Sequence, residues 1–256
     1  MNSFTEENYL KAIYKLVEKA GDVVTTNAIA EKMNTKAASV TDMLKKLADK
    51  KLINYQKYQG VSLSKKGEKV ALTIIRKHRL WEMFLVEHLD FKWDEVHDIA
   101  EQLEHINSDK LVERIDKFLN YPKVDPHGDP IPDTNGKLQI QKSYPLSKYK
   151  KNDVCTVTGV VDHSPAFLQY LDRSGITLGN EIKIKDVVEF DRSSGFAYVR
   201  RIVPARQADS GNGRCRAHCI AWQLDWLCIP VPSPYPGLYG DGKRIDAIDA
   251  GARKTR

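Results

Sequence analysis

The fold is decided by residues 36–63, which read KAASVTDMLKKLADKKLINYQKYQGVSL. In the first half of this stretch, apolar residues recur at helical spacing and must pack inward. They are Val40, Met43, Leu44 and Leu47. In the second half, short β-prone runs at 52–57 and 61–63 flank the turn residues Tyr58-Gln59-Gly60, which is typical of a β-hairpin. We therefore predict a helix over residues 36–50 and a hairpin directly after it.

Two more helices are predicted before this stretch. Residues 3–20 carry apolar side chains at helical spacing, and Ser3 with Glu6 three positions later indicates a capping box. Gly21 ends this helix, and residues 25–33 form a second, short one. This order of elements is typical of a winged helix-turn-helix: a helix, a short helix, a turn, a third helix and a hairpin.

The predicted helix over 36–50 has a polar face that suits DNA. Small hydroxyl side chains lie near its start and lysines further on, as a recognition helix in a major groove requires. The alternative is a solvated lysine face on an ordinary helix, but the hairpin and the short preceding helix favour DNA. The expected contacts to double-stranded operator DNA are Lys36, Ser39, Thr41, Lys45, Lys46 and Tyr58. The lysines would bind phosphates, with Ser39 and Thr41 near bases.

Three helices are predicted after the hairpin, over residues 65–89, 94–106 and 109–120. Asp94 and Ser108 are the expected caps of the last two. Five of the eleven prolines fall between residues 121 and 145, which indicates a linker. Residues 146–205 alternate β-branched runs with turns, and this pattern favours a small SH3-like β-barrel.

Length and charge leave several classes of protein open. The 256 residues can hold one large domain or two to three small ones, and a net charge of +6 is compatible with nucleic acid without establishing it. No run of about 18 apolar residues occurs, which argues against a membrane-spanning helix. The acidic N-terminal segment lacks the pattern of a signal peptide, so a cytoplasmic location is expected.

Residues 206–256 differ in character from the rest of the chain. They carry no steady periodicity, four prolines within residues 230–236, and three of the four cysteines. The spacing of Cys215, His218, Cys219 and Cys228 matches no familiar zinc site. We predict that this tail is disordered or non-native.

Ligand-type side chains gather on two of the predicted helices. On the helix over 94–106, four of them fall within about a quarter-turn of one another: His97, Glu101, Glu104 and His105. Such groups repel and desolvate one another unless a cation lies between them. On the preceding helix, His78 and Glu82 are four residues apart within an apolar stripe. Such a lone pair is as often a buried histidine with its carboxylate partner, but the two sets together predict a metal site.

The ligand types narrow both the metal and the function. Glutamate and histidine without cysteine or methionine suit Mn²⁺ or Fe²⁺ and argue against Cu⁺ or a thiolate zinc site. The H-E-x-x-H, P-loop and G-x-S-x-G patterns of enzymes are absent from the sequence. Beside a winged helix, the metal is better interpreted as a sensed ligand than as a catalyst. The alternatives are a winged-helix regulator with a structural metal that senses another signal, and a metal-dependent hydrolase.

These motifs resemble the DtxR/MntR family of metal-dependent transcriptional repressors, over roughly residues 3–205. The winged helix contributes TEENYLKAIYKL and SVTDMLKKLADKKLI. The most specific part is RKHRLWEMFLVEHLDFKWDEVHDIAEQLEHINSDKLVERI, which contains the family's ligand pattern H-x3-E, VHD and E-x2-EH. The segment FLQYLDRSGITLGNEIKI is similar to the family's SH3-like, or FeoA-like, domain.

The resemblance implies a mainly α N-terminal region followed by a small C-terminal SH3-like β-barrel. The implied domains are a winged helix-turn-helix at 1–66, a helical metal-binding and dimerisation domain at 67–121, a Pro-rich linker at 122–145, an SH3-like domain at 146–205, and the tail at 206–256. It also implies a homodimer formed through the helices after the winged helix, with the metal acting as corepressor.

The resemblance further implies a primary, activating metal site at Asn8, Glu101, Glu104 and His105. Manganese-responsive members carry glutamate at the position of Glu101 and iron-responsive members carry cysteine, which favours manganese here. Asn8 departs from the family, which has Asp or Met there, and its amide oxygen brings no charge to an ion. Lys11 stands where some manganese sensors have a second carboxylate, which argues against a two-manganese cluster.

A second, ancillary site is implied at His78, Glu82 and His97. In long members of the family, a ligand from the SH3-like domain completes this site. His163, or Asp162 beside it, occupies the matching region.

Overall fold

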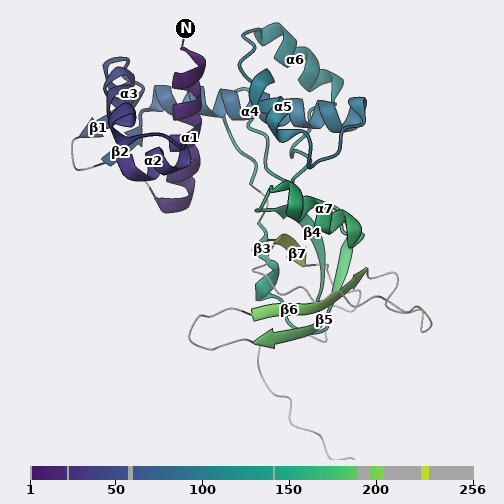
Figure 1. Cartoon of the computed structure of the whole chain (residues 1–256). Coiled ribbons are helices and arrows are strands. Elements are labelled where there is room, and N and C mark those ends of the chain that lie inside the picture. Colours follow the sequence, from purple (N-terminus) through teal and green to yellow (C-terminus); the bar gives the residue numbers. More distant parts are fainter. Residues whose placement is uncertain are drawn as a thin grey trace, which may run out of the picture.

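The structure is a computed structural model that describes residues 2–21, 23–56, 60–140, 142–189, 197–204 and 226–230. Three units follow one another along the chain (Figure 1). The N-terminal unit holds α1 (Phe4–Ala20), α2 (Thr26–Lys32), α3 (Ala37–Asp49), β1 (Ile53–Gln56) and β2 (Gly60–Leu63). The helical unit holds α4 (Lys65–Leu89), α5 (His97–Leu103) and α6 (Asp109–Phe118). This order confirms the predicted winged helix-turn-helix followed by further helices.

The N-terminal unit forms as its sequence predicts. Ser3 and Glu6 make the predicted capping box: the Glu6 backbone N–H donates to the Ser3 hydroxyl, and the Ser3 N–H donates to the Glu6 carboxylate. β1 and β2 pair antiparallel, with Ile53 opposite Leu63. The hairpin packs beside α3 and closes the hydrophobic core of this unit.

α3 presents the two faces that the sequence predicts. Val40, Leu44 and Leu47 are fully buried, and Met43 packs partly buried against the same core. The predicted DNA-contacting residues Lys36, Ser39, Lys45 and Lys46 are exposed, while Thr41 is half-buried and donates its hydroxyl to the Ala37 carbonyl. Tyr58 lies outside the described residues. The exposed face is therefore polar and basic, apart from the Lys45–Asp42 ion pair.

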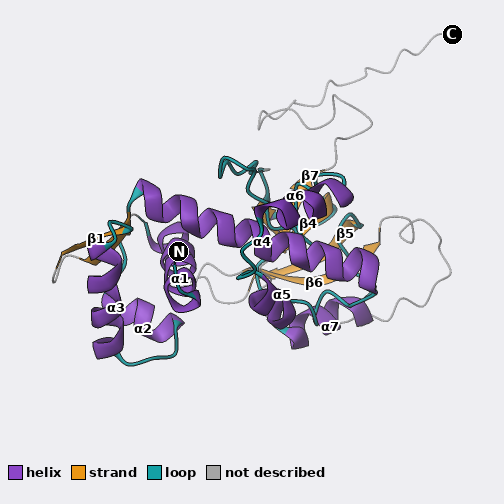
Figure 2. Ribbon diagram, turned by 90° about the horizontal axis from the view of Figure 1, so that it is seen from above, coloured by secondary structure: helices purple, strands orange, loops and turns teal. Residues whose placement is uncertain are grey.

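α4 connects the N-terminal and helical units as one long helix (Figure 2). Ser64 caps its start by accepting a hydrogen bond from the Gly67 N–H. One turn into the helix, Gly67 lies directly against the backbone of Leu52, which immediately precedes β1. This close approach fixes the direction in which α4 leaves the N-terminal unit.

α5 is shorter than predicted. It begins at His97 and not at residue 94, and it ends at Leu103, so Glu104 and His105 lie in the turn that follows. Asp94 does not cap it, because its carboxylate instead accepts a hydrogen bond from Gln169 in the C-terminal unit. The predicted cap Ser108 does accept from the Leu111 N–H at the start of α6.

The proline-rich segment after α6 differs from the predicted linker, because two arginines of α4 hold it against the helical unit. Arg76 donates to the Pro132 carbonyl at 2.6 Å, and Arg79 donates to the Pro130 carbonyl and to Asp129. Ile131 joins the core formed around Leu80. The prolines restrict the backbone of this segment, which is packed against the helical unit and is not a free linker.

The C-terminal unit is an antiparallel sheet with one helix packed on it. It comprises β3 (Tyr144–Pro145), a 3-10 turn (Leu146–Lys148), β4 (Val154–Val160), α7 (Pro165–Arg173), β5 (Glu181–Glu189), β6 (Ala197–Pro204) and β7 (Trp226–Pro230), with strand order β3-β7-β4-β5-β6. Its core includes Leu168 and Leu171 of α7 with Val157 and Ile182 of the sheet.

Strand β7 is a departure from the predicted tail. It lies between β3 and β4, so a boundary at residue 205 leaves a strand out of the sheet. The run WLCIP has the length and apolar composition of a short strand, which the surrounding prolines obscure. The other residues of the predicted tail, including Cys215, His218 and Cys219, lie outside the described residues.

Several contacts fix the C-terminal unit to the helical unit. Trp93 donates its indole N–H to Asp172 of α7 at 3.1 Å, and the Val160 N–H of β4 donates to the His127 carbonyl. None of the helices that the structure describes is both long enough and apolar enough to cross a membrane.

Replacing Gly67 should test the packing of α4. In an exposed helix, glycine-to-alanine stabilises by about 0.5–1 kcal/mol. Here the added Cβ would overlap the Leu52 carbonyl oxygen, so we expect Gly67→Ala to lower the free energy of unfolding by more than about 2 kcal/mol. Urea unfolding measures the change, with the exposed neighbour Lys66→Ala as control. A Gly67→Ala protein as stable as wild type would contradict this packing.

Candidate metal centre

Ligand-type side chains from several parts of the chain meet between the three units. α4 contributes His78 and Glu82, whose spacing of four residues places both on one buried face. α5 contributes His97 and Glu101 at the same spacing, and the following turn adds Glu104 and His105. The helix of the DNA-binding unit that reaches them is α1, through Glu7, Asn8 and Lys11.

Glu104 is the centre of the first group of contacts. Its carboxylate is fully buried and accepts hydrogen bonds from Lys11 Nζ at 2.7 and 2.8 Å. The same carboxylate lies 2.7 Å from His78 Nδ1. One acidic side chain therefore contacts both α1 of the N-terminal unit and α4 of the helical unit.

His105 is held by a residue that the sequence did not indicate. Its Nδ1 lies 2.7 Å from the carboxylate of Glu7, which is buried, and its ring stacks on Phe4. Nε2 lies 3.7 Å from Glu104. A histidine whose Nδ1–H is bound by a carboxylate presents Nε2 as a ligand, which is the usual arrangement around protein-bound metals. Glu7 is thus a positioning residue for His105.

The side chain of Asn8 bears on whether this cluster fits a metal ion. Its Oδ1 atom is buried and has no hydrogen-bond partner within the described part of the chain. A buried carbonyl oxygen without a partner is costly. An amide oxygen is also a normal ligand for a hard cation. The residues present therefore fit a metal ion.

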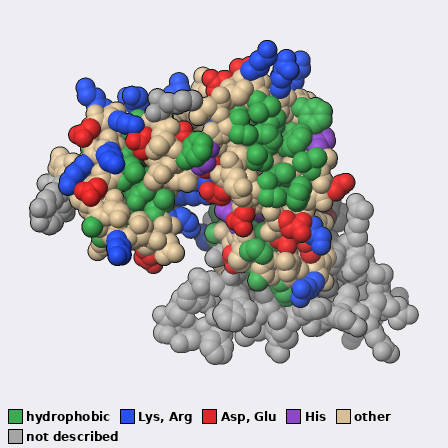
Figure 3. Space-filling view, turned by 45° about the horizontal axis from the view of Figure 1, so that its top comes forward, with side chains coloured by type: hydrophobic (Ala, Val, Ile, Leu, Met, Phe, Trp, Pro, Cys, Tyr) green, Lys and Arg blue, Asp and Glu red, His purple; other side chains and the backbone are tan. Residues whose placement is uncertain are grey.

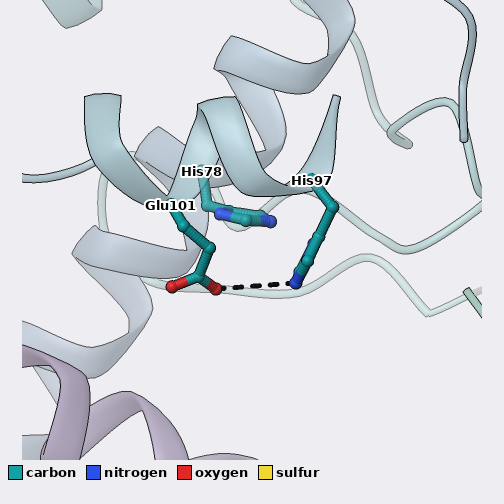
Figure 4. A group of neighbouring side chains, drawn as sticks. All are labelled: His78, His97 and Glu101. Carbon is teal, nitrogen blue, oxygen red and sulfur yellow. Dashed lines mark ion pairs between the residues drawn. The ribbon is translucent and has the colours of Figure 1, made fainter. Parts of the chain in front are cut away.

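The structure does not separate the predicted ligands into the two sets expected. Ligand atoms of His78, His97 and Glu101 all lie within 4.8 Å of one another. Figure 4 shows these three side chains converging, with His97 Nε2 3.7 Å from Glu101. Glu101 was expected in the primary set and the two histidines in the ancillary set. The two sets are neighbours because α4 and α5 pack side by side.

A second cluster lies deeper and includes two residues that the sequence interpretation missed. Ligand atoms of Glu82, Asp125 and His127 lie within 4.8 Å of one another, and all three residues are buried. His127 Nε2 lies 2.8 Å from the Trp93 carbonyl, whereas Nδ1 faces Glu82 at 3.7 Å and has no hydrogen-bond partner among the described residues. This second orphaned atom also fits a cation.

Of the two residues proposed from the C-terminal unit, the structure places His163 beside this cluster. Its ring stacks on His127 with centroids 4.6 Å apart, and its Nε2 lies 3.1 Å from the Val160 carbonyl. Asp162 is exposed and instead accepts a hydrogen bond from the Ser164 N–H. His163 is therefore the better placed of the two.

Electrostatics support a cation at the deeper cluster. Burial raises the pKa of Asp125, and the nearby carboxylates of Glu82 and Asp129 raise it further, to about 7. Burial lowers the pKa of His127, but the carboxylates of Glu82 and Asp125 outweigh it and raise that pKa to about 9. Both shifts express an excess of buried negative charge, which one divalent ion would neutralise.

A second functional feature is an apolar face on the helical unit. Figure 3 shows hydrophobic side chains gathered over this part of the molecule. Leu89, Phe118 and Tyr121 are more than half exposed, and Phe118 contacts the rings of Phe84 and His88. Exposed apolar side chains grouped in this way are typical of a protein–protein interface.

Comparison with known proteins identifies the family. Three family models match consecutive parts of the chain: the iron dependent repressor N-terminal DNA binding domain at residues 2–61, the iron dependent repressor metal binding and dimerisation domain at 64–133, and the FeoA domain at 144–194. The HTH-type transcriptional regulator MntR of Oceanobacillus iheyensis is 35% identical over 119 residues, 46% of this chain and 80% of that protein. The chain belongs to the family of metal-dependent transcriptional repressors.

Other repressors are similar to this chain in sequence and in structure. The iron-dependent repressor IdeR of Mycobacterium tuberculosis is 34% identical over 128 residues, which cover 50% of this chain and 55% of that protein. The chain thus spans about half the length of the IdeR relatives it matches. A solved manganese-dependent transcriptional repressor in complex with manganese superposes with a TM-score of 0.68 at 29% identity, covering 88% of this chain and 100% of that one.

The manganese regulator SloR superposes with a TM-score of 0.64 at 34% identity, covering 88% of this chain and 98% of that one. The family consists of DNA-binding regulators, so the prediction that the chain is not an enzyme is confirmed. The predicted resemblance and fold class are confirmed as well, including the FeoA domain.

Arg79 should govern the position of Asp125 and His127. Its guanidinium contacts Asp125, Asp129 and the Pro130 carbonyl, and lysine cannot reproduce this fork of donors. We expect Arg79→Lys to speed hydrogen exchange of backbone amides at residues 125–131 by about tenfold, from the loss of hydrogen bonds to charged groups. The control is Lys77→Arg on the same helix. Unchanged exchange in Arg79→Lys would show that the segment is held by other contacts.

Proposed function

We propose that this chain represses transcription as a homodimer that binds double-stranded operator DNA when Mn²⁺ or Fe²⁺ is bound between α1 and the turn after α5. One observation carries the proposal. The α1 residues Glu7 and Asn8 belong to the DNA-binding unit, and they meet Glu104 and His105 of the helical unit in a buried ligand cluster. A cation in this cluster would connect the N-terminal, DNA-binding unit to the helical unit.

The primary ion would be held by Asn8, Glu101, Glu104 and His105. When bound, it supplies two positive charges that neutralise the carboxylates. The protein's own contribution is positional, because α1 is then fixed against the turn after α5 and cannot move independently. This restriction would lower the entropic cost of placing two recognition helices about 34 Å apart, one turn of DNA.

The ancillary ion would be held at the deeper cluster. The predicted ligands here are His78, Glu82, His97 and His163, to which we add Asp125 and His127. The orphaned Nδ1 of His127 and the ring of His163 beside it support this extension. Because α4, the segment after α6 and the C-terminal unit all contribute, an ion here would stabilise their packing.

The ligand chemistry favours Mn²⁺ within the pair Mn²⁺ and Fe²⁺. The primary set consists of two carboxylates, one amide oxygen and one imidazole, which is a hard set. The relatives named above include both iron-dependent and manganese-dependent repressors.

The homodimer would form through the apolar face of the helical unit. Leu89, Phe118 and Tyr121 expose the kind of side chain that obligate interfaces bury. The match of residues 64–133 to a metal binding and dimerisation domain supports dimerisation through this unit. Two copies joined there would present two recognition helices to successive turns of one DNA duplex.

Removing a primary ligand should abolish the metal response. We expect Glu104→Ala and His105→Ala to lose Mn²⁺-dependent binding to duplexes that the Mn²⁺-loaded wild type selects from a random library, while remaining folded dimers. Each variant removes a coordinating group from the connection between α1 and the helical unit. Gel shifts with and without Mn²⁺ measure the response, and light scattering measures the dimer.

The matched control is Glu87→Ala, an exposed acidic residue of α4 outside the cluster, which should respond as wild type does. If both ligand variants respond to Mn²⁺ normally, the primary site is wrong. If the wild type binds DNA equally well with and without metal, the ion is structural and another signal is sensed.

The lysines of α3 should contribute to DNA affinity through phosphates. We expect Lys46→Ala to weaken binding uniformly across sequences and to reduce the slope of log affinity against log salt by about one, the effect of losing one phosphate contact. Lys110→Ala, on α6, serves as control because it is remote from α3. An unchanged slope in Lys46→Ala would remove this lysine from the interface.

A further inference from the structure

The ammonium group of Lys11 lies between Glu101 and Glu104, two of the four predicted primary ligands. Its Nζ lies 2.6 Å from Glu101 Oε1, 2.7 Å from Glu104 Oε1 and 2.8 Å from Glu104 Oε2. A lysine ammonium has three N–H donors, and these three carboxylate oxygens satisfy all of them. Lys11 is itself buried, with 6% of its surface exposed.

We propose that Lys11 is the resident cation of the primary site. In the metal-free protein its ammonium pairs with both Glu101 and Glu104, and it must leave these carboxylates before they can coordinate a metal ion. This inference rests on the proposed function, since it concerns the same site. It adds that metal binding there is an exchange of cations and not the filling of an empty site.

The burial of Glu104 is the reason why such a cation is needed. A carboxylate with no exposed surface is strongly disfavoured unless it is paired. Lys11 and His78 lie within hydrogen-bond distance of it, and His105 Nε2 lies 3.7 Å away. The metal-free site therefore keeps Glu104 paired with a cation, and the free energy of that pairing is subtracted from the affinity for any incoming ion.

Exchange of Lys11 for an incoming ion also favours divalent over monovalent ions. Replacing one buried monovalent cation by another, such as Na⁺ or K⁺, brings no added attraction to the two carboxylates. A divalent ion doubles the charge facing them. Lys11 thereby sets a threshold that monovalent ions do not cross and that divalent ions cross only at sufficient concentration.

The same contacts affect the metal-free conformation. Lys11 belongs to α1, whereas Glu101 and Glu104 belong to α5 and the turn after it. The salt bridges thus connect the DNA-binding unit to the helical unit before metal arrives. The unloaded repressor keeps a weaker version of the connection that a metal ion would provide.

Lys11→Met tests this proposal, because methionine keeps a long side chain without the charge. In EDTA, we expect the variant to unfold at a lower temperature than wild type, since Glu104 loses its cation. With Mn²⁺, we expect binding about tenfold tighter than wild type, as the loss of a competing charged hydrogen-bond partner implies. The stability deficit should then disappear at saturating Mn²⁺. Calorimetric Mn²⁺ titration and thermal unfolding are the measurements, on the full chain.

The matched control is Lys15→Met, one turn further along α1. Lys15 lines the adjacent pocket but makes no ion pair with either carboxylate among the described residues. If Lys15→Met tightens Mn²⁺ binding as much as Lys11→Met, general electrostatics explain the effect and the proposal fails. If Lys11→Met does not fold in EDTA, Lys11→Gln carries the same test.

Two outcomes separate this proposal from the proposed function. If wild type binds Mn²⁺ through Glu104 but Lys11→Met binds it no more tightly, only the role of Lys11 is wrong. If wild type binds no Mn²⁺, or Glu104→Ala binds it unchanged, the proposed primary site itself is wrong. Tighter binding in Lys11→Met together with lower stability in EDTA supports the exchange.

Discussion

A buried carboxylate must be neutralised, and the arrangement of this protein follows from how Glu104 meets that requirement. Glu104 is fully buried and contacts Lys11 of the DNA-binding unit and His78 of α4. The groups paired with this carboxylate therefore come from two different units. In the proposed repressor, a change in the cation bound at this residue would alter the contact between those units, and a metal ion here would act on DNA binding in this way.

The surrounding elements place the Glu104 carboxylate at the contact between the N-terminal and helical units. α4 runs through both the N-terminal and helical units, and Gly67 fixes its contact with the winged helix. The segment after α6 is held by Arg76 and Arg79 and carries Asp125 and His127 to the deeper cluster. The C-terminal unit reaches the same cluster through His163. Three units are thus coupled through adjoining sets of ligand-type residues.

Local patterns predicted much of this arrangement and failed where the decisive contacts are long-range. Periodicity located α3 with Leu44 and Leu47 inside, and the spacing of His78 and Glu82 indicated a ligand face. Local sequence patterns could not reveal that Glu7 pairs with His105, 98 positions away. They also could not show that the proline-rich segment near Asp125 is packed against α4. Asp94 failed as a cap because Gln169, distant in sequence, binds its carboxylate. Strand β7 was hidden because its partners in the sheet, β3 and β4, lie far before it.

The most direct test is an anaerobic titration of metal-free protein with Mn²⁺, Fe²⁺ and Mg²⁺, following duplex binding and bound metal in the same samples. The duplexes are those that the Mn²⁺-loaded protein selects. The account predicts that DNA affinity rises in step with occupancy of the primary site by Mn²⁺ or Fe²⁺. Mg²⁺ should have little effect, because it prefers oxygen ligands and water to imidazole. DNA affinity that does not change while Mn²⁺ fills the site would contradict it.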